Sequence, residues 1–178
     1  SNDAFYMRTL DDAVKLRTAL ETGTYKSALV VGASMVGIKV VELLNKAGIK
    51  TTMADMADRV FPLAAYENVS REIERRISAK GVKLALGCAL DYCEKTETGY
   101  ICNMTYGRQI TADLIVLCIG TRAATDLVDE EINVNRGIVV DEKNTVYDSR
   151  DNCNAIIETA TNTLIVGCKN TVIPNSVT

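Results

Sequence analysis

A glycine-containing segment between a short apolar run and an amphipathic stretch constrains this chain more than any other feature. Residues 30–37 have the sequence Val-Val-Gly-Ala-Ser-Met-Val-Gly, a version of the pattern G-x-G-x-x-G. In that pattern the first glycine ends a strand in a tight turn, the second position lets the backbone approach a pyrophosphate, and the third lets helix and strand pack closely. Ser34 occupies the second position, where it is small but adds a side chain. The segment therefore predicts a strand, a tight turn and a helix whose N-terminus offers free N–H groups to an anion.

The elements around this segment alternate between β and α. Apolar periodicity predicts strands at 27–31, 51–54 and 82–86 and helices at 35–47 and 67–80. We expect Val69, Ile73 and Ile77 to form the buried side of the second helix, and Glu67/Arg71 and Glu72/Arg76 to pair on its exposed side. An earlier helix is expected after Thr9, a cap residue followed by acidic residues.

The pattern then changes to short strand-like pieces. Residues 88–95, 100–105 and 108–112 are joined by tight turns and predict an antiparallel meander. The apolar run 114–119 is typical of a strand buried on both faces. We predict an α/β fold, a Rossmann-like three-layer domain whose parallel sheet has a β-meander in place of one crossover helix. This domain is expected at 25–124, between a flanking helix and linker at 1–24 and a turn-rich segment at 125–178.

The predicted strand at 51–54 is followed by Asp55, 18 residues after Gly37. A carboxylate there accepts hydrogen bonds from the ribose hydroxyls of a dinucleotide and repels a 2′-phosphate, which favours NAD(H) over NADP(H). Arg59 tempers this preference, because a nearby arginine accommodates a phosphate. The alternative is that Gly32 and Gly37 only allow strand and helix to pack in a domain that binds no nucleotide.

Charge and composition exclude several classes of function. The net charge is −3 and no Lys/Arg stripe occurs, which argues against nucleic-acid and membrane-surface partners. The longest apolar runs are too short to span a bilayer, and no signal peptide is evident. The chain has no histidine, which excludes His-based catalysis and His metal sites within it, and we predict neither a catalytic residue nor a metal site. Six cysteines without a secretory signal predict reduced thiols and a cytoplasmic location.

Cys88 and Cys93 have the spacing C-x4-C, which suggests a redox pair. Both fall in one predicted strand, and an odd separation of five places them on opposite faces, about 16 Å apart when extended. A disulfide needs Cα atoms within about 7 Å. We therefore expect both to be small buried hydrophobic residues, and we expect Cys118 to lie in the core.

Several motifs in this chain resemble a known family. The segments "MRTLDDAVKLRTAL", "VVGASMVG", "MADMADRVFP", "ADLIVLCIGTRAAT" and "GIVVDEKNTVYDS" are similar, in that order, to those of FAD-dependent pyridine nucleotide-disulfide oxidoreductases. The most similar branch is that of NADH oxidases and CoA-disulfide reductases. The resemblance covers most of the chain and implies the NAD(P)-binding domain of such an enzyme, with flanking fragments of an FAD domain.

The resemblance also implies cofactors, partners and site residues. NAD(H) would bind this chain and give a hydride to FAD held by another domain of the parent protein. The segment 125–178 would return the chain towards that FAD-type domain. The residues implied to bind the dinucleotide are Gly32, Ser34, Met35 and Gly37 at the pyrophosphate, Asp55 at the ribose and Gly120 near the nicotinamide.

The chain departs from the family pattern at three places, and two of these departures, Lys39 and Ile157-Glu158, favour a second hypothesis. Lys39 stands where the family often has glutamate, Ala123-Ala124 where it usually has Pro-Asn, and Ile157-Glu158 where it has Gly-Asp in contact with FAD. The N-terminal FAD domain of the family has no counterpart in these residues, so we expect the chain alone not to turn over. The alternative function is a catalytically degenerate dinucleotide-binding sensor or interaction module.

Overall fold

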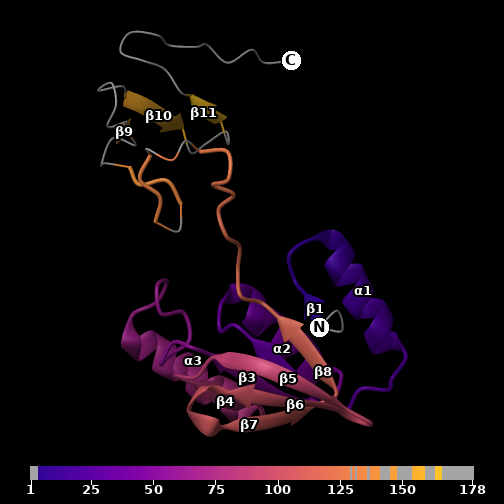
Figure 1. Cartoon of the computed structure of the whole chain (residues 1–178). Coiled ribbons are helices and arrows are strands. Elements are labelled where there is room, and N and C mark those ends of the chain that lie inside the picture. Colours follow the sequence, from indigo (N-terminus) through magenta and orange to yellow (C-terminus); the bar gives the residue numbers. More distant parts are fainter. Residues whose placement is uncertain are drawn as a thin grey trace. The chain divides into compact units, whose positions relative to one another are not determined.

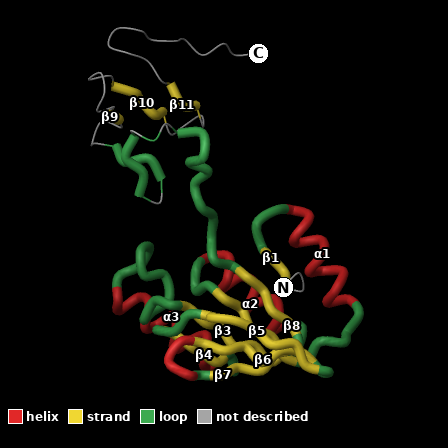
Figure 2. The backbone as a smooth tube through the Cα atoms, in the orientation of Figure 1, coloured by secondary structure: helices red, strands yellow, loops and turns green. Residues whose placement is uncertain are grey.

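The computed structural model describes residues 4–128, 130, 132–135 and 137–140, and the backbone of 145–147, 154–158 and 163–165. The chain divides into two compact units, Ser1–Gly120 and Thr121–Thr178. Figure 1 follows the chain from the first unit into the second, and Figure 2 distinguishes helices, strands and loops.

The first unit is built on a five-stranded, all-parallel sheet with the order β1-β8-β2-β3-β4. Its strands are β1 (Phe5–Tyr6), β2 (Ser27–Val31), β3 (Lys50–Asp55), β4 (Lys83–Leu86) and β8 (Leu114–Leu117). Its helices are α1 (Leu10–Glu21), α2 (Met35–Lys46) and α3 (Glu67–Ala79). The strands and helices predicted around the glycine segment are confirmed to within a residue or two at their ends. The predicted strand at 114–119 is shorter, and β1 was not predicted.

The helices begin and end where local chemistry dictates. Thr9 caps α1 through a capping box: its side chain accepts from the N–H of Asp12, and Asp12 accepts from the N–H of Thr9. On α3 the two predicted ion pairs are present, with 3.4 Å between Arg71 and Glu67 and 2.7 Å between Arg76 and Glu72. These charged pairs lie on the solvent side, where exposed ion pairs contribute little to stability.

The predicted buried side of α3 is partly wrong. Val69 is 46% exposed, whereas Ser70 is fully buried. Ile73 and Ile77 pack against the core but are only partly buried. The helix lies against the edge of the sheet at β4, so its apolar stripe is covered less completely than that of α2, which lies over the central strands.

The two faces of the sheet are covered by different layers. On β2, Ala28 and Val30 belong to a core cluster with residues of all three helices, whereas Leu29 and Val31 belong to a second cluster with residues of the meander. Side chains alternate between faces along a strand, so one apolar run supplies both clusters. The result is a three-layer arrangement of helices, parallel sheet and meander, which confirms the predicted fold class.

The meander consists of β5 (Leu90–Thr96), β6 (Gly99–Met104) and β7 (Gln109–Ala112), with a short 3-10 turn at Thr105–Gly107. All its pairs are antiparallel, and it connects β4 to β8. The β5–β6 register shifts between Leu90 and Tyr92, so that Asp91 has no partner in the ladder. This bulge bends the start of β5.

In the second unit the described backbone includes a three-stranded antiparallel sheet of β9 (Thr145–Tyr147), β10 (Asn154–Glu158) and β11 (Thr163–Ile165). Cys153 and Cys168 lie outside the described residues, and the side chains of Ile157 and Glu158 are not described. Within the part of the chain that is described, no helix has the length and apolar character required to cross a membrane.

Candidate functional site

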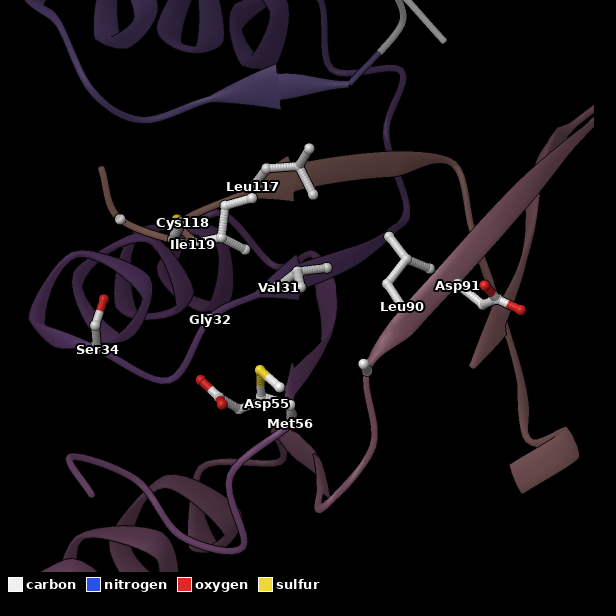
Figure 3. Close-up of a pocket in the computed structure, with 12 residues that line it drawn as sticks. Val31, Gly32, Ser34, Asp55, Met56, Leu90, Asp91, Leu117, Cys118 and Ile119 are labelled. Atoms are coloured by element: carbon white, nitrogen blue, oxygen red, sulfur yellow. The ribbon is translucent and has the colours of Figure 1, made fainter. Parts of the chain in front are cut away.

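The candidate site lies where the order of the parallel strands reverses. From β2 the chain proceeds outward to β3 and β4, and then returns to place β8 on the opposite side of β2. Ligands of open α/β sheets bind at such a point, outside the carboxyl ends of the strands. A cavity of about 440 Å³ lies there, within the range of small-molecule sites. Figure 3 shows the residues that line it: Val31, Gly32, Ser34, Asp55, Met56, Ala89, Leu90, Asp91, Leu117, Cys118, Ile119 and Gly120.

Gly32 forms the turn at the end of β2. Its φ of 112° lies in a region that L side chains rarely adopt, and its N–H donates to the carbonyl of Ala54 at 2.8 Å. A Cβ at this position would collide with the backbone carbonyl of Cys118. Only glycine therefore fits this turn, which lines the cavity.

Gly37 lies in the first turn of α2, directly against that turn. A Cβ here would overlap the carbonyl oxygen of Gly32. Gly37 is therefore the contact that brings the start of α2 against the end of β2. It does not line the cavity itself.

The N-terminus of α2 has the features of an anion site. Ser34 is the N-cap residue, and its side chain makes no capping hydrogen bond. No acidic residue occurs in the first turn, in contrast to Asp11 and Asp12 in α1. The first N–H groups of a helix have no acceptor within the helix, and the helix dipole adds positive potential there. This helix end is thus left uncapped, with the Ser34 hydroxyl at the cavity (Figure 3).

Asp55, at the end of β3, is held in place by two backbone groups. Its Oδ2 accepts from the N–H of Ala33 at 2.6 Å, and its Oδ1 accepts from the N–H of Ala57 at 2.8 Å. A carboxylate has about four acceptor sites, so two remain after these bonds. The side chain is therefore fixed beside the glycine turn, with acceptor capacity for a pair of hydroxyls.

Two cations near the site in sequence are directed elsewhere. The guanidinium of Arg59 donates to the carbonyl of Pro62 at 2.8 Å, and the ammonium of Lys39 contacts Glu42 at 2.8 Å on the solvent side of α2. Neither lines the cavity. The cavity walls therefore carry no basic side chain among the described residues, and their charged groups are Asp55 and Asp91.

The remaining walls are largely apolar. Leu90 of β5 and Ile119 after β8 provide much of this surface (Figure 3). Cys118 is buried, and burial raises the pKa of its thiol to about 11. It stays a neutral thiol near pH 7 and is no nucleophile there.

Of the residues predicted from sequence, Gly32, Ser34, Asp55 and Gly120 line the cavity. Met35 does not: its side chain is 75% exposed. The sequence reasoning missed the wall formed by β5. Nothing in the local sequence of residues 89–91 marks them, since they reach the cavity only because the meander folds over the sheet.

Comparison with known proteins identifies the family. A family model described as pyridine nucleotide-disulphide oxidoreductase matches residues 1–154. The nitric oxide reductase FlRd-NAD(+) reductase of Pectobacterium atrosepticum is 30% identical over 135 residues, which are 75% of this chain and 36% of the relative. The NADH-dependent phenylglyoxylate dehydrogenase subunit epsilon of Aromatoleum evansii is 31% identical over 139 residues, 77% of this chain and 32% of the relative.

A solved structure agrees with the observed fold. The water-forming NADH oxidase from Lactobacillus brevis, determined with NADH bound, superimposes with a TM-score of 0.72 at 24% identity. The match covers 91% of this chain and 39% of the oxidase. The chain therefore spans about a third of the length of the curated relatives it matches and somewhat more of this oxidase.

Proposed function

The chain belongs to the pyridine nucleotide-disulphide oxidoreductase family, and from that premise we propose that it binds NAD(H) in the cavity at the ends of β2, β3 and β8. In this proposal it positions the nicotinamide for hydride transfer to a flavin held elsewhere in the parent protein. The observation that carries the proposal is the anchored Asp55 carboxylate beside an uncapped helix N-terminus and a glycine turn.

The pyrophosphate is assigned to the turn between β2 and α2. Gly32 presents backbone without a side chain, and the first N–H groups of α2 lack acceptors within the helix. Two negative charges at this helix end would gain from both hydrogen bonds and the helix dipole. The hydroxyl of Ser34 adds a donor that glycine would not supply.

The adenosine ribose is assigned to Asp55. Its two backbone bonds fix the carboxylate before a ligand arrives, so binding orders no further side chain there. A 2′-phosphate at the same place would meet a negative charge without a cation to offset it, since Arg59 is engaged with Pro62. The proposal therefore includes a preference for NAD(H) over NADP(H).

The apolar end of the cavity, near Leu90 and Ile119, is assigned to the nicotinamide side. NADH supplies a hydride when bound, and the protein's part is to orient the ring and exclude water around it. Gly120 lies at this end, where the absence of a Cβ leaves space beside the ring. Relatives named as NAD(+) reductases and as an NADH oxidase support an NAD-linked role for the parent protein.

Amide chemical shifts of the isotope-labelled chain, titrated with NADH, test this assignment of the site. We expect the largest shifts at Gly32, Ser34 and Asp55 and little change at Gly81, which precedes β4 and therefore lies at the amino ends of the parallel strands, at the opposite edge of the sheet from the cavity. Shifts concentrated in the groove between α2 and α3, lined by Ile73 and Arg76, would contradict the proposal.

A second candidate function is the catalytically degenerate sensor or interaction module. Lys39 favours it, because its ammonium faces Glu42 on the solvent side of α2 and offers nothing to the nicotinamide. Purification of the full parent protein distinguishes the two. A yellow protein with bound flavin supports the oxidoreductase, whereas a colourless and folded protein supports the degenerate module.

A further inference from the structure

Two cysteines that the dinucleotide site does not use face each other across the meander. Cys93 of β5 is directly opposite Cys102 of β6, and their sulfur atoms are 3.4 Å apart, with the Cys93 thiol donating to the Cys102 sulfur. The cysteine spacing suggested Cys88 as the partner of Cys93, and the expectation that those two do not pair agrees with the structure. Cys88 instead donates to the carbonyl of Ala85.

The register of the β5–β6 hairpin places Cys93 and Cys102 at a pair of positions whose Cα atoms are close enough for a disulfide. Thr96 and Gly99 flank the two-residue turn and pair with each other, so they occupy the hydrogen-bonded type of pair. Pairs alternate in type along an antiparallel ladder, which makes Cys93 and Cys102, three steps on, a non-hydrogen-bonded pair. Opposite Cα atoms are then about 4.5 Å apart, inside the range of about 4.4–6.8 Å that disulfides require.

We propose that Cys93 and Cys102 are a redox-active dithiol that hydrogen peroxide converts to a cross-strand disulfide between β5 and β6. In the first step the Cys93 sulfur attacks peroxide, the O–O bond breaks, and sulfenic acid and water form. In the second step the Cys102 sulfur attacks the Cys93 sulfur as its thiol proton passes to the sulfenic oxygen; an S–S bond forms, the S–O bond breaks, and that oxygen leaves as a second water. Both sulfur atoms are oxidised and one peroxide is reduced, so atoms and electrons balance.

The burial of the two thiols sets the order of these steps. Cys88 is buried as expected, but the expectation that Cys93 is buried is wrong, because Cys93 is partly exposed. Cys102 is fully buried, so peroxide reaches Cys93 first. Burial raises the pKa of Cys102 to about 12, so Cys102 is a neutral, enclosed thiol when peroxide reaches Cys93. Its distance of 3.4 Å from the Cys93 sulfur makes it the resolving thiol. Of the other described cysteines, neither Cys88 nor Cys118 has the sulfur of another cysteine within hydrogen-bond distance.

The pair also lies close to the cavity. Cys93 is two residues beyond the bulge at Asp91, and Leu90 and Asp91 both line the cavity. Cys102 belongs to the same buried cluster as Val31, which lines the cavity from β2. The disulfide would therefore tie β5 to its neighbour immediately behind that wall.

Peptide mass mapping of the full chain after peroxide treatment tests the proposal. Serine replaces Cys153 and Cys168, so that the thiols counted are Cys88, Cys93, Cys102 and Cys118. We expect a Cys93–Cys102-linked peptide, a mass loss of about 2 Da, two fewer titratable thiols and full reversal by dithiothreitol. Cys88→Ser is the matched control and should leave the linked peptide unchanged.

Single substitutions decide between a disulfide and simple oxidation. In Cys102→Ala, the Cys93 thiol should stop at sulfenic or sulfinic acid, with a mass gain of about 16 or 32 Da. In Cys93→Ser, no linkage should form and Cys102 should stay a thiol. The proposal is wrong if, at the peroxide concentration that oxidises Cys93 in Cys102→Ala, the unsubstituted pair stays reduced or accumulates sulfinic acid. Prior oxidation of Cys88 or Cys118 would equally contradict it.

Discussion

Replacement of Asp55 by asparagine separates the contribution of its charge from that of its shape. The carboxylate accepts from the N–H groups of Ala33 and Ala57, one on each oxygen. Asparagine has one acceptor oxygen, so one of these N–H groups would face an amide donor. A part-buried donor without an acceptor costs about 1–3 kcal/mol, which corresponds to a lowering of Tm by about 3–9 °C for a chain of this size.

The same substitution is expected to weaken NADH binding. Hydrogen bonds to a charged acceptor contribute about 1.5–3 kcal/mol, so we expect the Kd for NADH to rise by about 10- to 100-fold. The Kd for NADPH should change less, because the loss of the acceptor is offset by the loss of repulsion against the 2′-phosphate. The ratio of the two affinities therefore falls.

The assay is calorimetric titration of the wild-type chain and Asp55→Asn with both dinucleotides, below the Tm of the variant. Asp58→Asn is the control, since Asp58 is exposed, three residues away and outside the cavity. An unchanged Kd for NADH in folded Asp55→Asn would refute the assignment of the ribose. An equal loss in Asp58→Asn would show that the effect is one of net charge.

Three further predictions concern the helix α2. Gly37→Ala should lower the unfolding free energy by about 3 kcal/mol or more, because the new Cβ overlaps the Gly32 carbonyl. The control Gly81→Ala places its Cβ in open space and should cost only the strain of a positive φ, about 1–2 kcal/mol. Chemical denaturation measures both losses, and equal losses would contradict the packing argument. Ser34→Asp should cap α2 and raise the thermal midpoint of the chain. It should also weaken NADH binding at least about tenfold, because the carboxylate repels the pyrophosphate. Tighter NADH binding by this variant would contradict the phosphate site. Hydrogen bonds from Lys39 and Lys46 lower the pKa of Glu42 from 4.5 to about 2, so its stabilising contribution is present above pH 4.5 and is lost as the pH falls towards 2. Thermal midpoints measured across that window should therefore fall less steeply in Glu42→Gln than in the wild type, and parallel curves would contradict the ion pair.

The sequence was sufficient for the elements that carry a strong local pattern. The strand β2, the helix α2 and the strand β3 follow from an apolar run, a helical apolar stripe and a second apolar run, with glycines at the breaks. Because the fingerprint sits inside this βαβ unit, the sequence alone places Gly32, Ser34 and Asp55 together, and all three line the cavity.

Features that depend on distant contacts could not be predicted in this way. The strand β1 has two residues and exists because Phe5 and Tyr6 pair with β8, more than a hundred residues later. The cavity wall formed by Leu90 and Asp91 depends on how the meander lies on the sheet and on a bulge in its first strand. Met35 belongs to the motif by its place in the sequence, yet its side chain is 75% exposed and does not line the cavity.

The measurement that tests the central claim most directly is calorimetric titration of the unmodified chain with NADH and with NADPH under identical conditions. The account predicts saturable binding of NADH with one site per chain and weaker binding of NADPH, because Asp55 accepts from a ribose diol and repels a 2′-phosphate. Failure of both to bind at millimolar concentration would contradict the proposed site, and tighter binding of NADPH would contradict the role of Asp55.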